Sequence, residues 1–199
     1  MERTNSQRLD LNLPDSNILY FRDFFTTERA NEYLEVLRNT VPWQQDDIKV
    51  FGKVHPQPRL TALFGNNEKP YSYSNITMQP RAFSNELFEI KKEIEKIVKV
   101  NFTTCLLNLY RTGKDSNGWH ADNEKELGKN PIIASVSLGQ ERFFHLKHRT
   151  WPDVKHKMLL EHGSLLLMQG ETQHHWLHQL PKTARPIGER INLTFRVIL

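Results

Sequence analysis

A histidine and an aspartate two positions apart, His120 and Asp122, have the types and spacing for metal chemistry. On an extended segment, side chains at positions i and i+2 point to the same side. One imidazole nitrogen and one carboxylate oxygen then face a common point. An isolated pair of this kind on a surface loop is usually only solvated. A second histidine would complete a face of two histidines and one carboxylate, which is typical of non-heme Fe(II) oxygenases.

The second histidine has to come from another part of the chain. Residues 173–181 are the densest candidate, because they contain His174, His175 and His178. A lone histidine is more often a surface or satisfied core residue than a metal ligand. Spacing alone does not choose among these three histidines.

Residues 190–196 alternate polar and apolar side chains and predict a strand with two unlike faces. Arg190, Asn192, Thr194 and Arg196 share one face. That face lies either in water or along a cavity, and the pattern leaves both open. In a cavity, its two arginines would suit a ligand with two carboxylates, because guanidinium pairs with carboxylate through two parallel hydrogen bonds.

The segment before His120 supports the cavity interpretation. Asn108 and Tyr110 share one face of an apolar strand, so an amide and a phenol can hydrogen-bond the same anion. Gly113 and Gly118 allow the turn that returns the chain to His120.

Length and composition favour one ordinary globular domain. The chain has 199 residues, 38% hydrophobic and 25% charged. Its single cysteine, Cys105, excludes an internal disulfide, favours a reducing compartment and is interpreted as a core residue. A net charge of +4 is compatible with a polyanionic partner. No apolar run approaches the length of a membrane span, so we expect no membrane partner.

The order of the predicted elements indicates a mostly β fold with flanking helices (α+β). Helices are expected after Thr26 and over 87–98, with Lys91, Lys92, Lys96 and Lys99 on a solvated face. Short strand-like runs follow at 104–110, 132–138, 142–146, 158–160, 164–168, 176–178 and 190–198. Such runs favour a jelly roll, which can carry a ligand in its mouth. We expect a flexible segment over 1–17 and a single domain over 18–199.

Several motifs together resemble the AlkB family of Fe(II)- and 2-oxoglutarate-dependent dioxygenases. They are Asn-x-Tyr…Trp-His-x-Asp from Asn108, His-Gln-Leu-Pro from His178 and Arg-x-Asn-Leu-Thr-Phe-Arg from Arg190. Residues 131–139 and 161–168 also look like that family. The resemblance extends from about Val50 to the C-terminus and is specific as a combination. It implies a double-stranded β-helix, or jelly-roll, fold.

The resemblance also implies roles for individual residues. His120, Asp122 and His178 match the iron ligands, which identifies the third ligand as the histidine before Gln-Leu-Pro. The cofactors would be Fe(II), 2-oxoglutarate and O2. The residues that match the 2-oxoglutarate site are Arg190, Asn108 and Tyr110 at the distal carboxylate and Asn192 and Arg196 at the other end.

For the substrate, the resemblance implies alkylated DNA, with RNA as an alternative. A methylated base must leave the duplex to reach an iron. Tyr73 matches the aromatic that stacks on the flipped base, and Glu124 matches an acidic residue of the base pocket. Residues 51–53 look like the finger hairpin of the branch that repairs double-stranded DNA, so Phe51 is expected to insert into the base stack. Residues 48–80 would then form a nucleotide-recognition segment.

The sequence therefore predicts a demethylase of 1-methyladenine and 3-methylcytosine in DNA, acting as a monomer. Two alternatives remain: the same chemistry on RNA or protein, and a non-catalytic nucleic-acid-binding jelly roll. Basic residues that could contact phosphates are Arg59, Arg142, Lys147 and Arg149. With no targeting segment, location would be cytoplasmic in a prokaryote and nuclear in a eukaryote.

Overall fold

The structure is a computed structural model that describes residues 8–50, 53–66, 71–73 and 76–199. Phe51 lies outside these residues, and so does the side chain of Tyr73. Among the described residues, no helix is long and apolar enough to cross a membrane.

The larger sheet of the described chain is built from eight strands, all antiparallel to their neighbours except for the last pair. Their spatial order is β1 (Arg8–Asp10), β2 (Asn17–Phe21), β14 (Ser164–Gln169), β11 (Ile133–Gly139), β16 (Arg190–Arg196), β9 (Thr104–Tyr110), β5 (Leu60–Gly65) and β8 (Arg81–Ala82). The small sheet is antiparallel, in the order β10 (Asn117–His120), β15 (Trp176–Leu180), β12 (Arg142–His148) and β13 (Lys155–Leu160).

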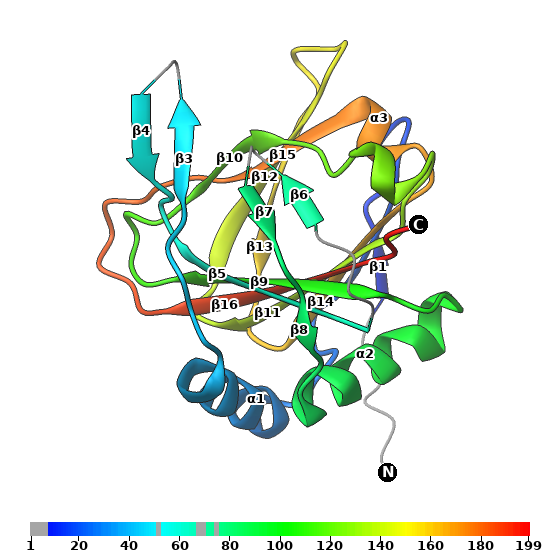
Figure 1. Ribbon diagram of the computed structural model, residues 1–199. Coiled ribbons are helices and arrows are strands. Elements are labelled where there is room, and N and C mark those ends of the chain that lie inside the picture. The colour runs from blue at the N-terminus through cyan, green and yellow to red at the C-terminus, as the bar shows by residue number, and fades with distance from the viewer. Residues whose placement is uncertain (1–7, 51–52, 67–70, 74–75) are drawn as a thin grey trace.

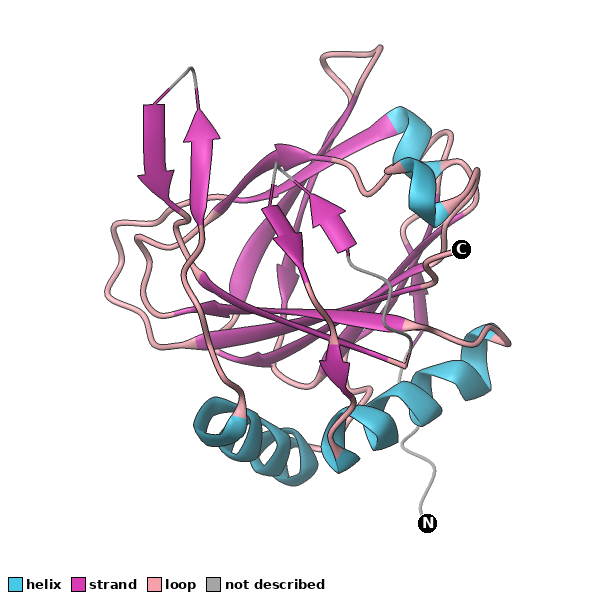
Figure 2. Ribbon diagram, in the orientation of Figure 1, coloured by secondary structure: helices cyan, strands magenta, loops and turns pink. Residues whose placement is uncertain are grey.

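From β9 onward the chain passes back and forth between the two sheets, as Figures 1 and 2 show. Strands β9, β11, β14 and β16 belong to the large sheet, and β10, β12, β13 and β15 belong to the small one. This is the strand exchange of a double-stranded β-helix, which confirms the predicted jelly roll and its helical flank.

Two helices lie below the large sheet in Figure 1, on the side away from the small sheet. They are α1 (Thr27–Thr40) and α2 (Asn85–Val98). Thr26 caps α1 by accepting a hydrogen bond from the Arg29 amide at 3.3 Å, as the hydroxyl before the apolar repeat predicts. Two shorter helical turns, η1 (Lys125–Leu127) and α3 (Thr172–His175), lie near the small sheet.

Side chains along each strand of the large sheet point alternately to its two faces, and each face packs into its own hydrophobic core. One face packs on the helices, through residues such as Leu107, Leu193 and Phe195, all fully buried. The other face packs on the small sheet, through residues such as Leu166 and Leu146. Because the second core also contains a polar stretch, a ligand cavity can form between the sheets.

One prediction fails in this part of the molecule. Lys91 is not solvated, since its side chain is 6% exposed and its Nζ lies 2.6 Å from Glu95 Oε1. An ion pair one helical turn apart lets the chain bury a lysine that the pattern places in water. Within the segment 1–17, residues 8–10 form β1 and pair with β2.

Two two-stranded sheets lie on the side of the large sheet opposite the helices (Figure 1). One pairs β3 (Asp47–Val50) with β4 (Lys53–Pro56), which confirms the expected hairpin, although its turn lies outside the described residues. The other pairs β6 (Tyr71–Tyr73) with β7 (Ile76–Met78).

Candidate metal centre and ligand cavity

A cavity of about 300 Å³ opens between the two sheets. Polar side chains of β9 and β16 form its wall on the large sheet, and β10 and β15 form the wall on the small sheet. The polar face of residues 190–196 is therefore buried around a cavity, which resolves the alternative that the sequence leaves open. The lining includes Asn108, Tyr110, His120, Asp122, Glu124, His178, Arg190, Asn192, Thr194 and Arg196.

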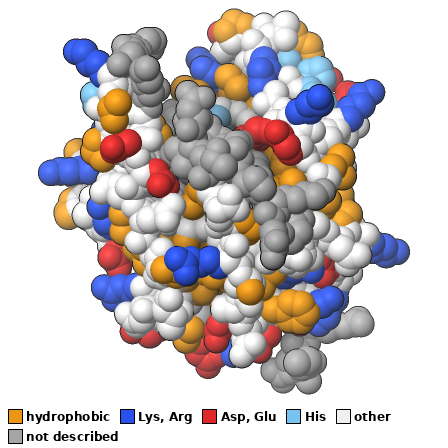
Figure 3. Space-filling view, viewed as in Figure 1, with side chains coloured by type: hydrophobic (Ala, Val, Ile, Leu, Met, Phe, Trp, Pro, Cys, Tyr) orange, Lys and Arg blue, Asp and Glu red, His pale blue; other side chains and the backbone are white. Residues whose placement is uncertain are grey.

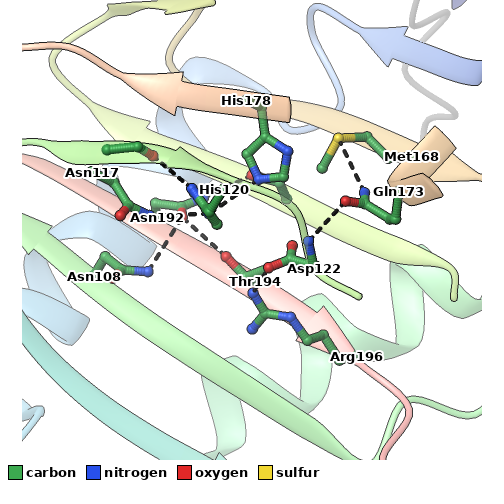
Figure 4. Close-up of polar contacts among 12 residues, drawn as sticks. Asn108, Asn117, His120, Asp122, Met168, Gln173, His178, Asn192, Thr194 and Arg196 are labelled. Atoms are coloured by element: carbon green, nitrogen blue, oxygen red, sulfur yellow. Dashed lines mark hydrogen bonds and ion pairs between the residues drawn. The ribbon is translucent and has the colours of Figure 1, made fainter. Parts of the chain in front are cut away.

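His120, Asp122 and His178 meet at one end of this cavity. Each offers a ligand atom, and these atoms all lie within 4.8 Å of one another. Strand pairing explains the meeting, because His120 in β10 is the direct cross-strand partner of His178 in β15. Their Nε2 atoms are 3.1 Å apart (Figure 4).

The protonation of the triad suits a cation. His120 Nδ1 lies 2.7 Å from the Gly118 carbonyl oxygen, which can only accept, so Nδ1 donates to it and Nε2 is the ring atom that faces His178. Burial, with a contribution from His120, lowers the pKa of His178 to about 3. His178 is therefore neutral at physiological pH, as a metal ligand must be.

Asp122 is held from two sides. Its backbone amide donates to Gln173 Oε1 at 2.9 Å, and its Oδ1 accepts from Arg196 at 2.8 Å (Figure 4). Burial by itself raises the pKa of Asp122, but the charge of Arg196, helped by the two histidines, lowers it to about 2. The carboxylate is thus ionised and oriented before any ligand binds.

The other two histidines of the 173–181 segment point elsewhere. His174 Nε2 lies 2.9 Å from Asn130 Oδ1, and His175 Nε2 lies 3.7 Å from a carboxylate oxygen of Glu171. Only His178 joins the pair at residues 120 and 122, which is the choice that the sequence resemblance implies.

His175 belongs to a second group of potential ligands, with Asp15 and His148. Its chemistry is less suited to a metal. His148 Nδ1 accepts hydrogen bonds from the amides of Thr150 and Trp151 at 3.2 and 3.1 Å. The proton of the neutral ring is therefore on Nε2, the atom that faces Asp15 at 3.3 Å and that a metal would need.

Arg190 brings a buried positive charge to the cavity. Its side chain is fully enclosed, its Nη2 donates to Ser137 Oγ at 2.9 Å, and its Nε has no hydrogen-bond partner. Burial lowers the pKa of Arg190 to about 10, so the guanidinium remains charged at neutral pH. No described carboxylate lies within ion-pair distance of it, which makes a carboxylate ligand its natural partner.

Two further residues predicted to bind 2-oxoglutarate, Asn108 and Asn192, belong to a hydrogen-bonded row. Asn192 Nδ2 donates to Ser135 Oγ at 2.8 Å and to the Val136 carbonyl at 3.1 Å. Asn192 Oδ1 accepts from Thr194 at 3.0 Å and from Asn108 Nδ2 at 3.5 Å. Asn192 is thus engaged with the protein and orders its neighbours on both strands.

Two of the basic residues that could contact phosphates, Arg59 and Arg142, are buried. Arg59 is 6% exposed, and its Nε donates to Asn108 Oδ1 at 2.7 Å inside the cavity. Arg142 is 4% exposed and donates to the carbonyls of Pro181 at 2.7 Å and Asp115 at 3.1 Å. Each arginine is held by internal acceptors and is not free to reach a phosphate.

Sequence reasoning missed Gln173 and the role of Arg59. Both act through partners distant in sequence, since Gln173 lies 51 residues from Asp122 and Arg59 lies 49 residues from Asn108. The local sequence holds no signal for such contacts, which depend on how the strands pair.

The hydrogen bond from the Asp122 amide to Gln173 can be tested by substitution. Gln173→Leu leaves the Asp122 amide without its acceptor, and loss of such a ligand-orienting contact is expected to weaken Mn(II) binding about tenfold. Calorimetric titration with Mn(II) measures the change. Gln179→Leu is the control, because Gln179 contacts His145 rather than a triad residue. Equal affinities in the two variants would contradict the role given to Gln173.

Comparison with known proteins agrees with this geometry. The family model described as the 2OG-Fe(II) oxygenase superfamily matches residues 17–196. Alpha-ketoglutarate-dependent dioxygenase alkB homolog 3 of Bos taurus is 40% identical over 189 residues, covering 88% of this chain and 64% of that protein. DNA oxidative demethylase ALKBH2 of Arabidopsis thaliana is 36% identical, covering 92% of this chain and 67% of that protein.

The chain thus spans a little under two thirds of the length of the first of these relatives. Among solved structures, OsALKBH1 aligns with a TM-score of 0.69 over 96% of this chain and 100% of that one, at 16% identity. That likeness concerns the fold. Taken together, the family match and the identities show that the chain belongs to the AlkB family, within the 2OG-Fe(II) oxygenase superfamily.

The residues present fit the cofactors that the superfamily implies. Two histidines, of which His178 is neutral, and an ionised carboxylate form the ligand set of non-heme Fe(II). Arg190, charged and without a carboxylate partner among the described residues, fits one end of 2-oxoglutarate.

Proposed function

We propose that this chain is an Fe(II)- and 2-oxoglutarate-dependent dioxygenase that demethylates N-alkylated bases, such as 1-methyladenine and 3-methylcytosine, in DNA. One observation carries the proposal: the triad and the unpaired charge of Arg190 share a single cavity. The choice of DNA draws on relatives whose name is DNA oxidative demethylase.

In this proposal each wall of the cavity has its own task. His120, Asp122 and His178 hold the metal, and Arg196 keeps Asp122 ionised and in place. Arg190, with Tyr110 and Asn108, holds the distal carboxylate of 2-oxoglutarate, while Asn192 and Arg196 lie toward its other end. When bound, Fe(II), O2 and 2-oxoglutarate supply the oxidising power that hydroxylates the methyl group, which is then released as formaldehyde.

The base is expected to enter the cavity flipped out of its stack, since a paired base cannot reach the triad. Glu124 lines the cavity, and its Oε2 is buried without a hydrogen-bond partner. An ionised carboxylate only accepts hydrogen bonds, so it suits the exocyclic amino group of adenine or cytosine. Tyr73, on β6, is the residue that we propose to stack on the base.

We propose that Phe51 and the segment 48–80 contact duplex DNA, because residues 51–53 resemble the finger hairpin of the family. Phe51 would fill the gap that the flipped base leaves, as apolar wedges do in other DNA-binding proteins. Ile48, in β3, lines the cavity and supports a place for this segment beside the base.

Formaldehyde release from matched methylated oligonucleotides tests the function. We expect release to require Fe(II) and 2-oxoglutarate and to occur with 1-methyladenine and 3-methylcytosine in DNA. Single-stranded and duplex DNA and RNA of one sequence are compared. Formaldehyde release from RNA but not from DNA would show that RNA is the substrate. Consumption of 2-oxoglutarate without formaldehyde release from any oligonucleotide would overturn the nucleic-acid assignment.

The non-catalytic alternative explains less of the structure. A binding module has no need for an ionised Asp122 between two histidines, or for a buried arginine that lacks a carboxylate partner. Demethylation of protein remains compatible with the metal centre, but the acceptor oxygen of Glu124 favours a base with an amino group. We also propose that the chain acts as a monomer, which sedimentation analysis can check.

Glu124 gives a prediction about base preference. Glu124→Gln replaces one acceptor oxygen by a donor, and loss of a charge-assisted hydrogen bond is expected to lower kcat/KM for 1-methyladenine about tenfold. The value for 3-methylthymine, which lacks an amino group at that edge, should change less. A parallel loss on both bases would remove Glu124 from base recognition.

A further inference from the structure

The small sheet has an outer face whose residues, apart from Trp119, do not line the cavity. Along β12, Phe144 and Leu146 point into the core, while Phe143, His145 and Lys147 point outward. The two long helices lie on the far side of the molecule (Figure 1). We define the outer face by Trp119, Phe143, His145, Lys147, Lys155 and Lys157.

Positive charge on this face is not neutralised within the sheet. Lys147 lies directly opposite Lys155 across the β12–β13 pair, and His145 lies opposite Lys157. Like charges directly opposite each other destabilise a sheet. Strands β10, β12, β13 and β15 contain no Asp or Glu, and the nearby acids Glu141 and Asp153 lie in the flanking turns. On the face seen in Figure 3, by contrast, acidic and basic side chains are interspersed.

Two exposed aromatic rings accompany these cations. Phe143 is 43% and Trp119 is 39% exposed. Lys157 Nζ lies 3.9 Å from the centroid of the Phe143 ring, and Lys147 Nζ lies 4.4 Å from the ring of Trp119. Each ring is thus covered by an ammonium group on a flexible stem, which can move away when a better partner arrives.

We propose that the outer face binds single-stranded nucleic acid, with bases stacked on Trp119 and Phe143 and phosphates contacted by Lys147, Lys155 and Lys157. Base stacking on an aromatic side chain is stronger than an exposed cation–π pair, so a base can displace the lysine. The displaced ammonium then meets a phosphate, and the like-charge opposition across the sheet is relieved. An acidic peptide would use the lysines but would leave the rings without partners.

The position of Trp119 connects this face to the cavity. Trp119 immediately precedes the triad residue His120 in β10, lines the cavity, and carries Lys147 of the outer face over its exposed ring. A strand held on the outer face would therefore pass close to the metal centre. The proposal rests on the outer face alone and holds whether or not the cavity performs demethylation.

Helix α2 supplies a matched control for both kinds of contact. Phe88 is 49% exposed, and Lys92 Nζ lies 5.2 Å from its ring centroid. Lys92 and Lys96 are exposed on this helix, as Lys155 and Lys157 are on the sheet. Phe88→Leu and the double variant Lys92→Gln/Lys96→Gln therefore repeat the chemical changes on an unrelated surface.

The experiment measures binding of unmethylated, fluorescein-labelled oligo(dT), oligo(rU) and a DNA duplex by anisotropy over a range of salt concentrations. Lys155→Gln/Lys157→Gln is expected to weaken oligo(dT) binding about tenfold and to reduce the slope of log K against log salt by about 1.4, which is two phosphate contacts. Phe143→Leu is expected to weaken it about tenfold without changing the slope. Both helix variants should stay within about twofold of the wild type.

The same losses with oligo(rU) would support the proposal, because stacking and phosphate contacts are common to both polymers. Equal affinities and slopes for the sheet and helix variants would overturn it. If duplex DNA suffered as much as the single strand from Phe143→Leu, the single-strand assignment would fall. Melting temperatures of all variants confirm that the fold is intact. Because the probes carry no methyl group, these outcomes are independent of formaldehyde release.

Discussion

His178→Ala is expected to abolish formaldehyde release and to weaken Mn(II) binding more than about 100-fold, because losing a ligand must cost more than the 10- to 100-fold attached to an orienting contact. The triad has no spare member: His174 and His175 point to Asn130 and Glu171. His120→Ala and Asp122→Ala should behave in the same way. Calorimetric titration with Mn(II) measures binding independently of turnover.

His175→Ala is the matched control for this prediction. It removes a histidine three positions away that lies outside the triad, so metal binding and turnover should be retained. A His178→Ala variant that keeps full activity, together with a His175→Ala variant that loses it, would show that the third ligand is assigned wrongly. Melting temperatures establish that a loss of activity is not a loss of fold.

The metal pair and the polar strand could be predicted from the sequence because they depend on local periodicity. Residues two apart on an extended segment share a side, and this placed Arg190, Asn192 and Arg196 on one face before any tertiary contact was known. The third ligand is different in kind. The direct pairing of β10 with β15 puts His178 opposite His120, and spacing within one segment holds no information about that register.

Resemblance to a family fills that gap, because the histidine before Gln-Leu-Pro matches the third iron ligand of the family. The resemblance does not predict the contacts that residues outside these motifs make. The charge pattern predicts a solvated Lys91, yet Lys91 is buried with Glu95, and Arg142, which could have contacted a phosphate, is held by internal carbonyls. A charged residue can be buried wherever a partner is built beside it, and a pattern of charges in sequence does not show such partners.

Arg190→Met is expected to raise the concentration of 2-oxoglutarate needed for half-saturation by roughly ten- to a hundredfold, because it removes the charged partner of a carboxylate. Direct titration of the Mn(II)-loaded protein with 2-oxoglutarate should show the same change in Kd. An unchanged affinity would remove Arg190 from the cosubstrate site.

The stability of the ligand-free protein makes this prediction sharper. Arg190 is a buried charge without a carboxylate partner among the described residues, so an apolar side chain of similar length should leave the melting temperature unchanged or raise it.

Arg142→Met is the matched control. Arg142 is equally enclosed, but it donates to the carbonyls of Pro181 and Asp115, so its loss leaves those acceptors unsatisfied and should lower the melting temperature. If the site binds a carboxylate, the two arginines should have opposite effects. Arg190 should contribute to 2-oxoglutarate binding at the expense of stability, and Arg142 should contribute to stability alone. If Arg190→Met melted lower than Arg142→Met while binding 2-oxoglutarate normally, Arg190 would be a structural residue.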